Sequence, residues 1–166
     1  MNRSLKAMAA VTALVFAFPG FAAEKAQTFV DKAAAGGLFE VQSSELALDM
    51  SKSPEVQSFA KMMIEDHGKA NAALKALATK EGLKVPATLD QKHAAKIKTL
   101  KNAGSQFDPP YVKAQLEGHQ DTIKLFEGYA KDGDNTALQA FANETLPTLK
   151  THLEKIEAIS GKLGTQ

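Results

Sequence analysis

The sequence predicts an all-helical fold, an antiparallel bundle of four long helices with a short extra helix in the crossover between its two halves. Apolar residues recur at spacings of three and four, and the strict alternation typical of strands is scarce. Two short links separate neighbouring helical segments, and short links make antiparallel neighbours. The connection between these two pairs is longer and has a helical pattern of its own.

The first helical pair is delimited by capping residues and a glycine. A helix is expected over residues 29–50, with Thr28 as its N-cap. The next is expected to follow Ser53, a natural N-cap, and to continue to about residue 81. Gly82 then ends it, because glycine is the common residue just after a helix.

The second pair follows the crossover. A short helix is expected after Thr88, which forms a capping-box pattern with Gln91, and it should end near residue 102. A long helix is expected to open at Asp108, where two prolines suit a first turn, and to end near residue 131. The last helix is expected over about residues 135–160.

The first 22 residues have the order of a cleavable secretory signal. A short positive start carrying Arg3 and Lys6 precedes an apolar run over residues 7–18, and Ala22 supplies a small residue before the cut. This apolar run is too short for a membrane-spanning helix, which needs ~20 residues. We therefore expect a periplasmic or secreted protein with a single bundle domain over residues 23–166 and no transmembrane segment after cleavage.

Charge and composition exclude several classes of function. The 20 basic and 19 acidic residues give a net charge of +1; the signal holds two of the basic residues, so 18 remain and the mature charge is −1. Without a basic excess, a nucleic-acid partner is not expected. The chain has no cysteine, which excludes disulfides, thiolate metal sites and cysteine nucleophiles.

Three of the four histidines lie on apolar stripes of three different long helices. They are His67, His119 and His152. On the first helix, Glu40 lies on the inward stripe, and Glu45 lies on a neighbouring one as the alternative. A buried polar group without a partner costs ~1–3 kcal/mol, so three histidines should not accumulate in a core unless something binds them.

The partners of these histidines remain open at the level of sequence. They are a metal ion, each other, water, or the carboxylates of Asp66 and Asp121, which are expected to orient the rings by hydrogen bonding. Neutral imidazole suits Zn, Cu, Fe or Ni, so the cofactor is a transition-metal ion of undefined identity. A copper site that adds Met63, one turn before His67, is a further alternative.

Helical rise predicts the depth of each candidate in the bundle. Glu40 and His67 lie at similar distances from the turn between their helices, so they should share a layer. His119 and His152 do not, and His152 should lie ~9 Å deeper at 1.5 Å per residue. Pro147 offers a bend that could reduce this mismatch.

Four stretches resemble a bacterial envelope family of ferritin-like domains of unknown function, often labelled predicted outer membrane proteins. They are AAAGGLFEV (33–41), FAKMMIEDH (59–67), FDPPYVKAQLEGH (107–119) and LPTLKTHL (146–153). The resemblance covers nearly the whole mature domain in order. It implies a ferritin-like four-helix bundle, a periplasmic location and no firmly assigned activity. Its motif positions here are Glu40, Asp66, His67, His119 and His152.

The chain departs from true di-iron ferritins at the metal motif. Those proteins place Glu-x-x-His on two helices, whereas the residues three before the stripe histidines are Ile64, Leu116 and Leu149. A ferroxidase centre of the usual kind is therefore not expected.

Three functional hypotheses follow. The first is a non-catalytic envelope or stress-linked module, with an envelope protein as partner and the histidines satisfied internally. The alternative is a transition-metal-binding bundle that uses Glu40, His67, His119 and His152. The third is a pH-sensitive module, in which acid charges the buried histidines and loosens the bundle. No pattern of catalytic residues points to an enzyme.

Overall fold

The computed structural model describes residues 25–164, and the expected secretory signal lies outside this range. Within it, all regular structure is helical, which confirms the predicted fold class. The elements are α1 (Ala26–Met50), α2 (Pro54–Lys80), α3 (Gln91–Lys101), the 3₁₀ turn η1 (Gly104–Gln106), α4 (Asp108–Asp132) and α5 (Thr136–Leu163).

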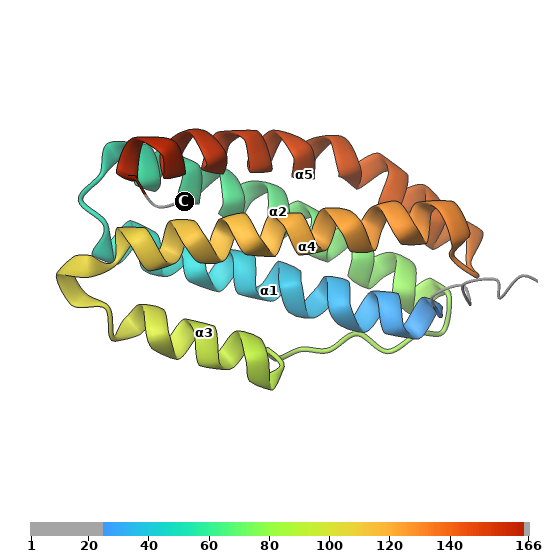
Figure 1. Cartoon of the computed structure of the whole chain (residues 1–166). Helices are drawn as coiled ribbons and strands as arrows, with labels where there is room; N and C mark the ends of the chain where they lie inside the picture. The colour runs from blue at the N-terminus through green and yellow to red at the C-terminus, as the bar shows by residue number, and fades with distance from the viewer. Residues whose placement is uncertain (1–24, 165–166) are drawn as a thin grey trace, which may run out of the picture.

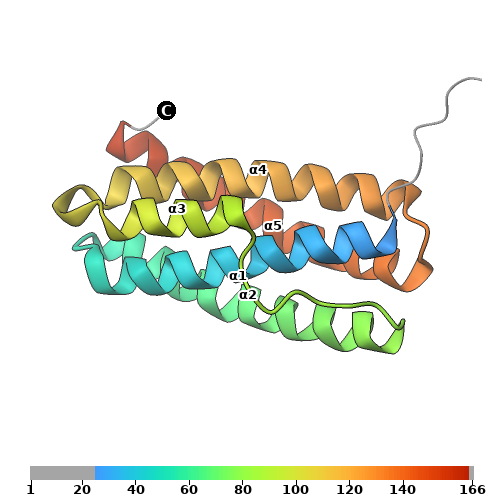
Figure 2. The same ribbon diagram turned by 90° about the horizontal axis from the view of Figure 1, so that it is seen from below.

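The four long helices form two hairpins. Helix α1 packs against α2, and α4 packs against α5, while α2 also contacts α5 and α1 contacts α4 to close the bundle (Figure 1). Helix α3 lies outside the bundle along α1 and α4, and the segment after α2 crosses the outside of the bundle to reach it (Figure 2). This arrangement confirms the predicted short extra helix in the crossover.

The caps of the first hairpin match the prediction in part. Ser53 caps α2, since its Oγ accepts a hydrogen bond from the Val56 backbone N–H at 3.3 Å. Gly82 follows that helix with a φ of 72°, a conformation that favours glycine. The expected cap at Thr28 is wrong, because α1 begins earlier, at Ala26, after Lys25.

The caps of the second half show one further correction. Thr88 lies in the loop, and Asp90 caps α3 by accepting a hydrogen bond from the His93 N–H at 2.8 Å. A carboxylate two residues later in the chain therefore takes the role expected of Thr88. Asn135 caps α5 by accepting from the Leu138 N–H at 3.0 Å.

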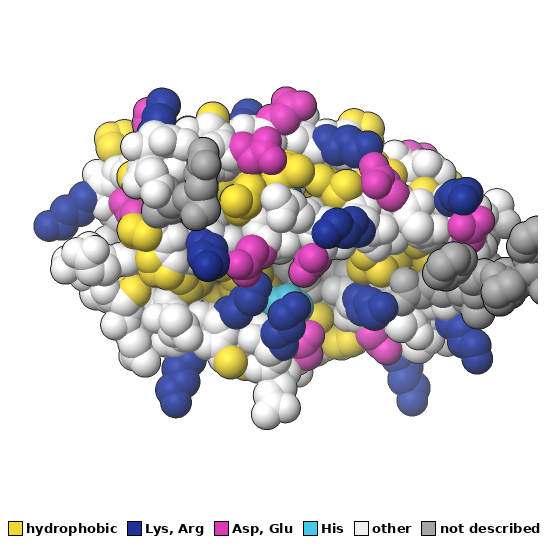
Figure 3. Space-filling model, viewed as in Figure 1, with side chains coloured by type: hydrophobic (Ala, Val, Ile, Leu, Met, Phe, Trp, Pro, Cys, Tyr) yellow, Lys and Arg dark blue, Asp and Glu magenta, His cyan; other side chains and the backbone are white. Residues whose placement is uncertain are grey.

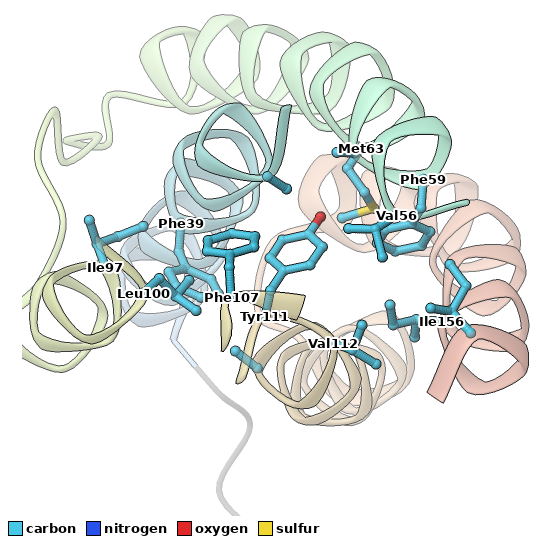
Figure 4. Packing of buried hydrophobic residues seen from close by; sticks show 14 residues of the cluster. Phe39, Val56, Phe59, Met63, Ile97, Leu100, Phe107, Tyr111, Val112 and Ile156 are labelled. Carbon is cyan, nitrogen blue, oxygen red and sulfur yellow. The ribbon is translucent and has the colours of Figure 1, made fainter. Parts of the chain in front are cut away.

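The core consists of two apolar clusters at opposite ends of the bundle. Figure 4 shows one cluster. Helices α1 and α4 contribute the aromatic rings of Phe39 and Tyr111, α2 contributes Phe59 and Met63, and α5 contributes Ile156. The other includes Phe29, Leu74, Phe126, Leu138 and Leu149. On α2, α4 and α5, the stripe histidine falls in sequence between residues of the two clusters, so a polar layer separates the apolar halves.

A glycine of α1 leaves room for a polar side chain of α2. A methyl group at Gly37 would lie 1.9 Å from Oδ1 of Asn71 on α2, far inside van der Waals contact. The lack of a side chain at Gly37 therefore leaves room for the Asn71 amide between α1 and α2, one turn from Glu40. Over residues 25–164, no helix has both the length and the apolar character needed to cross a membrane.

Candidate metal centre

The three stripe histidines meet in the centre of the bundle. One ligand atom from each of His67, His119 and His152 lies within 4.8 Å of the others. Their ring centroids are 5.3–5.6 Å apart. The side chains are 7%, 1% and 1% exposed, respectively, and they come from α2, α4 and α5. Both hairpins therefore contribute to one buried imidazole cluster.

Each ring has a nitrogen without a hydrogen-bond partner among the described residues. These atoms are Nε2 of His67, Nε2 of His119 and Nδ1 of His152. A buried polar atom left in this state costs ~1–3 kcal/mol. An ion or a water molecule that bonded to these nitrogens would therefore stabilise the folded protein.

Hydrogen bonds to the opposite nitrogens define two of the three ring tautomers. Nδ1 of His119 lies 2.8 Å from the Gln115 carbonyl oxygen, which can only accept, so Nδ1 carries the proton. Nε2 of His152 lies 3.0 Å from Oδ2 of Asp66 and donates to this carboxylate. The remaining nitrogens, Nε2 of His119 and Nδ1 of His152, therefore present lone pairs. Metal-binding histidines have the same kind of outer partner.

Burial keeps the rings neutral. Loss of solvation lowers the pKa of His67 well below its ordinary value, and the neighbouring His119 and His152 lower it further. Burial lowers the pKa of His119 to about 4, against an opposing contribution from its hydrogen bond to the Gln115 backbone. The pKa of His152 is also lowered by burial, although Asp66 opposes this shift. Three neutral imidazoles at neutral pH are suited to binding a cation.

Glu40 lies beside the cluster and is not one of its grouped ligands. Its Oε1 is 4.0 Å from Nδ1 of His119, the nitrogen that donates to Gln115. Burial raises the pKa of Glu40 to about 8, against the opposing effects of a hydrogen bond with the Gln115 side chain and the charge of Lys96. Since burial shifts Glu40 and His119 toward their neutral forms, they are not an ion pair at neutral pH.

A buried polar network links α4 to the backbone of α1 at Glu40. Nε2 of Gln115 donates to Oγ of Ser43 at 2.9 Å, and the Ser43 hydroxyl donates to the Glu40 carbonyl. Gln115 and Ser43 are fully buried. Gln115 was not among the site residues predicted from the sequence. Its position on the stripe of His119, one turn earlier, did indicate that it faces the core.

The structure separates the remaining candidates from the histidine cluster. Asp121 is exposed on α4 and lines a surface groove, so it does not take the orienting position that Asp66 occupies beside His152. Glu45 is exposed, which leaves Glu40 as the inward carboxylate of α1. Met63 is fully buried in an apolar cluster.

The predicted depth mismatch between His119 and His152 does not occur. Side chains of a helix lean toward its N-terminus, and α4 and α5 are antiparallel. The His119 side chain therefore leans away from the turn between these helices, while the His152 side chain leans toward it. The helix bounds also reduce the mismatch, because His119 lies 13 residues before the end of α4 and His152 lies 16 residues after the start of α5, which leaves about 4.5 Å at ~1.5 Å per residue. The two opposite leans reduce the remainder, although Pro147 lies within a single continuous α5.

The donor set fits a transition-metal ion. Zinc binds imidazole nitrogens at ~2.0–2.1 Å, which places tetrahedral ligands about 3.4 Å from each other. The three nitrogens here need only small side-chain rotations to close from within 4.8 Å. Three protein ligands leave one coordination position open for water or another small ligand.

Several solved structures share this fold. CopM in its Cu(II)-bound form has a TM-score of 0.72 and 14% identity, covering 85% of this chain and 99% of CopM. CopM in the Ag-bound form obtained by co-crystallization has a TM-score of 0.68 and 14% identity, covering 84% and 97%. A DUF305 fragment from Deinococcus radiodurans has a TM-score of 0.71 and 14% identity, covering 81% and 94%. At these identities, the similarity concerns the fold alone.

No curated protein sequence is significantly similar to this chain. A family model does match, and it covers residues 11–159, nearly the whole sequence. The match supports the expected domain of unknown function and not the label of an outer membrane protein. Because this model covers far more than half of the sequence, the chain belongs to the family described as "Domain of unknown function (DUF4142)".

Proposed function

We propose that this protein binds a transition-metal ion through His67, His119 and His152. One observation carries the proposal: one ligand atom from each of three buried imidazoles lies within 4.8 Å of the others, and each ring has a nitrogen without a hydrogen-bond partner among the described residues. Imidazole suits copper, zinc, nickel and iron. An ion in this layer would provide each nitrogen with the partner that it lacks among the described residues.

Copper is the first metal to test. CopM, which shares the fold, has been solved with Cu(II), Cu(I) and silver bound. The low identity carries over no ligand residue, so the argument for this chain depends on its own histidines. The site has no carboxylate among its grouped ligands, which favours copper or zinc over the carboxylate-rich di-iron chemistry of ferritins.

The burial of the site supports holding an ion rather than catalysing a reaction. His119 and His152 are each 1% exposed, and apolar clusters lie on both sides of their layer. A substrate larger than water has no room beside an ion in such a layer. The proposed role is therefore metal binding by a non-catalytic helical module.

A second candidate function is a non-catalytic envelope module whose histidines are satisfied without metal. The hydrogen bonds of His119 to Gln115 and of His152 to Asp66 favour it, because each ring has one internal partner. It does not explain the three nitrogens that remain without one. The two functions differ in whether the histidines bind an ion, which is directly measurable.

We also propose that residues 1–22 direct export and that the mature protein is periplasmic. Support comes from the positive start, the short apolar run and the small residue at position 22. Intact mass measurement of protein recovered from the periplasmic fraction should show a chain that begins at Ala23. An uncleaved chain retained with the cytoplasm would refute this proposal.

The test of metal binding uses untagged protein, because a histidine tag would bind metals itself. Elemental analysis and calorimetric titration with Cu(II), Zn(II) and Co(II) should give one ion per chain. His119→Ala should abolish this uptake, whereas His93→Ala should retain it, since His93 lies on α3 outside the cluster. Equal binding by the two variants, or none by the wild type, would refute the proposal.

A further inference from the structure

A surface groove runs between α1, α3 and α4 on the outside of the bundle. It has a volume of about 540 Å³, and its lining includes Asp90 and His93 from the α3 end and Gly118 and Asp121 from α4. Glu40 lies at its floor. Lysine and acidic side chains are interspersed over this face of the molecule (Figure 3). The groove thus offers potential cation ligands between solvent and the floor.

A small inner cavity shares part of its wall with this groove and reaches one histidine of the cluster. It has a volume of about 30 Å³, and its wall includes His67. Three residues line both the outer groove and the inner cavity, namely Gly36, Glu40 and Thr122. The cavity is large enough for an ion or a water molecule. These shared residues form a boundary between the groove and the cavity next to His67.

Two glycines leave space at this junction. A methyl group at Gly118 would lie 2.8 Å from Oε1 of Glu40, so a side chain there would displace the carboxyl group. A methyl group at Gly36 would lie 3.9 Å from Oγ1 of Thr122, which is an ordinary contact. The first glycine accommodates Glu40, and the second keeps the passage beside it wide.

Glu40 has one oxygen that no described residue contacts by hydrogen bonding. Its Oε2 has no partner, while its Oε1 lies 4.0 Å from His119. The carboxyl group therefore lines the groove and the cavity and borders one ring of the cluster. After releasing its proton to solvent, a carboxyl group with this placement can bind an ion before the ion reaches the three imidazoles.

We propose that the groove between α1, α3 and α4 is the entry route of the metal ion, and that Glu40 is the relay ligand between the groove and the histidine cluster. This inference rests on the proposed metal-binding function and adds a role for the carboxyl group that the grouped ligands leave out. It also explains why a buried carboxyl group is retained beside a cluster of neutral imidazoles, although its burial is unfavourable to folding.

The other opening toward the cavity is less suited to a cation. A pocket of about 280 Å³ between α1, α2 and the loop after α2 shares Asn71 and Leu74 with the inner cavity. Its wall is mainly apolar and includes Leu38, Val85 and Pro86. The lining of this pocket contains no carboxylate or imidazole. It therefore offers no such ligand to replace the water molecules that a hydrated ion loses on entry.

The positive charge of the lysines that line the groove is partly offset, so it does not prevent a cation from entering. The lining includes Lys32, Lys92, Lys96 and Lys124. Acidic groups on the same face offset them in part, because Glu117 lies 3.7 Å from Lys96 and two aspartates line the groove. A cation therefore meets a mixed surface and not a uniformly positive one.

Stopped-flow mixing of the full-length mature protein with Co(II) tests the route, because the visible absorption of Co(II) reports its coordination. Gly36→Ala and Gly36→Leu narrow the junction to increasing degrees. If the route is correct, association and dissociation should slow together, by about tenfold for Gly36→Leu, while the equilibrium affinity stays constant. Gly36→Ala adds a residue with a higher helix propensity, so it remains informative if the larger variant misfolds.

Two further variants complete the test. Ala87→Leu fills the apolar pocket on the other side and should leave both rates unchanged. Glu40→Gln should slow both rates at constant affinity; a loss of affinity at an unchanged association rate would make Glu40 a resident ligand and overturn the relay. Wild-type rates in Gly36→Leu, or slowing by Ala87→Leu, would overturn the route alone. A wild type that takes up no Co(II), Cu(II) or Zn(II) would overturn the metal-binding function and the route with it.

Discussion

Replacing His119 with leucine should stabilise the metal-free protein while it removes the response to metal. The ring is 1% exposed, and its Nε2 has no partner among the described residues. Leucine has a similar volume and no polar atom. The substitution removes a penalty of ~1–3 kcal/mol and a hydrogen bond worth ~0.5–1.5 kcal/mol. The Gln115 carbonyl oxygen loses the His119 ring as a donor. It lies within α4, where it can still accept a backbone hydrogen bond.

The expected net gain for the metal-free His119→Leu protein is therefore ~1 kcal/mol, or a rise in Tm of about 2–4 °C for a chain of this size. In the wild type, free metal at 1,000 times Kd should add ~4 kcal/mol. The variant should show neither this gain nor the associated rise in Tm. The metal thus reverses the order of stability of the two proteins.

Urea and thermal unfolding, each with and without Cu(II) or Zn(II), measure this reversal. His93→Leu is the matched control, because His93 is outside the cluster and its ring contacts Asp90 at 2.9 Å. That variant should gain no stability without metal and should keep the full metal response. If metal-free His119→Leu were less stable than the wild type by 1 kcal/mol or more, the argument from unpartnered nitrogens would be wrong.

Asp66→Asn should weaken metal affinity 10–100-fold, because the carboxylate orients His152 and increases its basicity; calorimetric titration with unchanged affinity would refute this. Gly37→Ala should stabilise the fold less than Gly68→Ala does, because a methyl group at Gly37 forces the Asn71 side chain to move. Gly68→Ala, which meets nothing within 4 Å, should stabilise it by ~1 kcal/mol; urea melts distinguish the pair. Between pH 4.5 and 6.5, the metal-free protein should become more stable as pH rises. In this range the three histidines bind protons in the unfolded chain, whereas burial keeps them largely neutral in the folded protein. From 6.5 to 8 its stability should fall, since folded Glu40, whose pKa burial raises to about 8, still holds a proton. A urea series whose midpoint falls steadily from pH 4.5 to 6.5 would contradict the sign, and Glu40→Gln should remove the fall above 6.5.

The sequence could predict the histidine cluster because helical periodicity determines which residues face a core. His67, His119 and His152 each lie on an apolar stripe, and all three are buried. Periodicity alone did not predict their common level in the bundle. That level depends on the residues at which α4 ends and α5 begins, and on the direction in which side chains lean along antiparallel helices.

Other parts of the site depend on contacts that are remote in sequence. The groove beside Glu40 exists because α3 packs along α1 and α4, and the sequence predicts α3 without predicting its position. Asp66 directly precedes His67, and Asp121 follows His119 by two residues. Of the two, only Asp66 contacts a ring of the cluster, that of His152 on α5. The cap at Asp90 was missed because Thr88 matched a common pattern, while the helix begins two residues later.

The distribution of the cluster over the two hairpins gives a bound ion a mechanical role. His67 belongs to the first hairpin, and His119 and His152 belong to the second, with about 50 residues between His67 and His119. One ion held by all three would cross-link the two hairpins in the folded protein and stabilise it by binding to that state alone. In a chain without cysteine, such a link would form and break with metal supply and not by thiol–disulfide exchange.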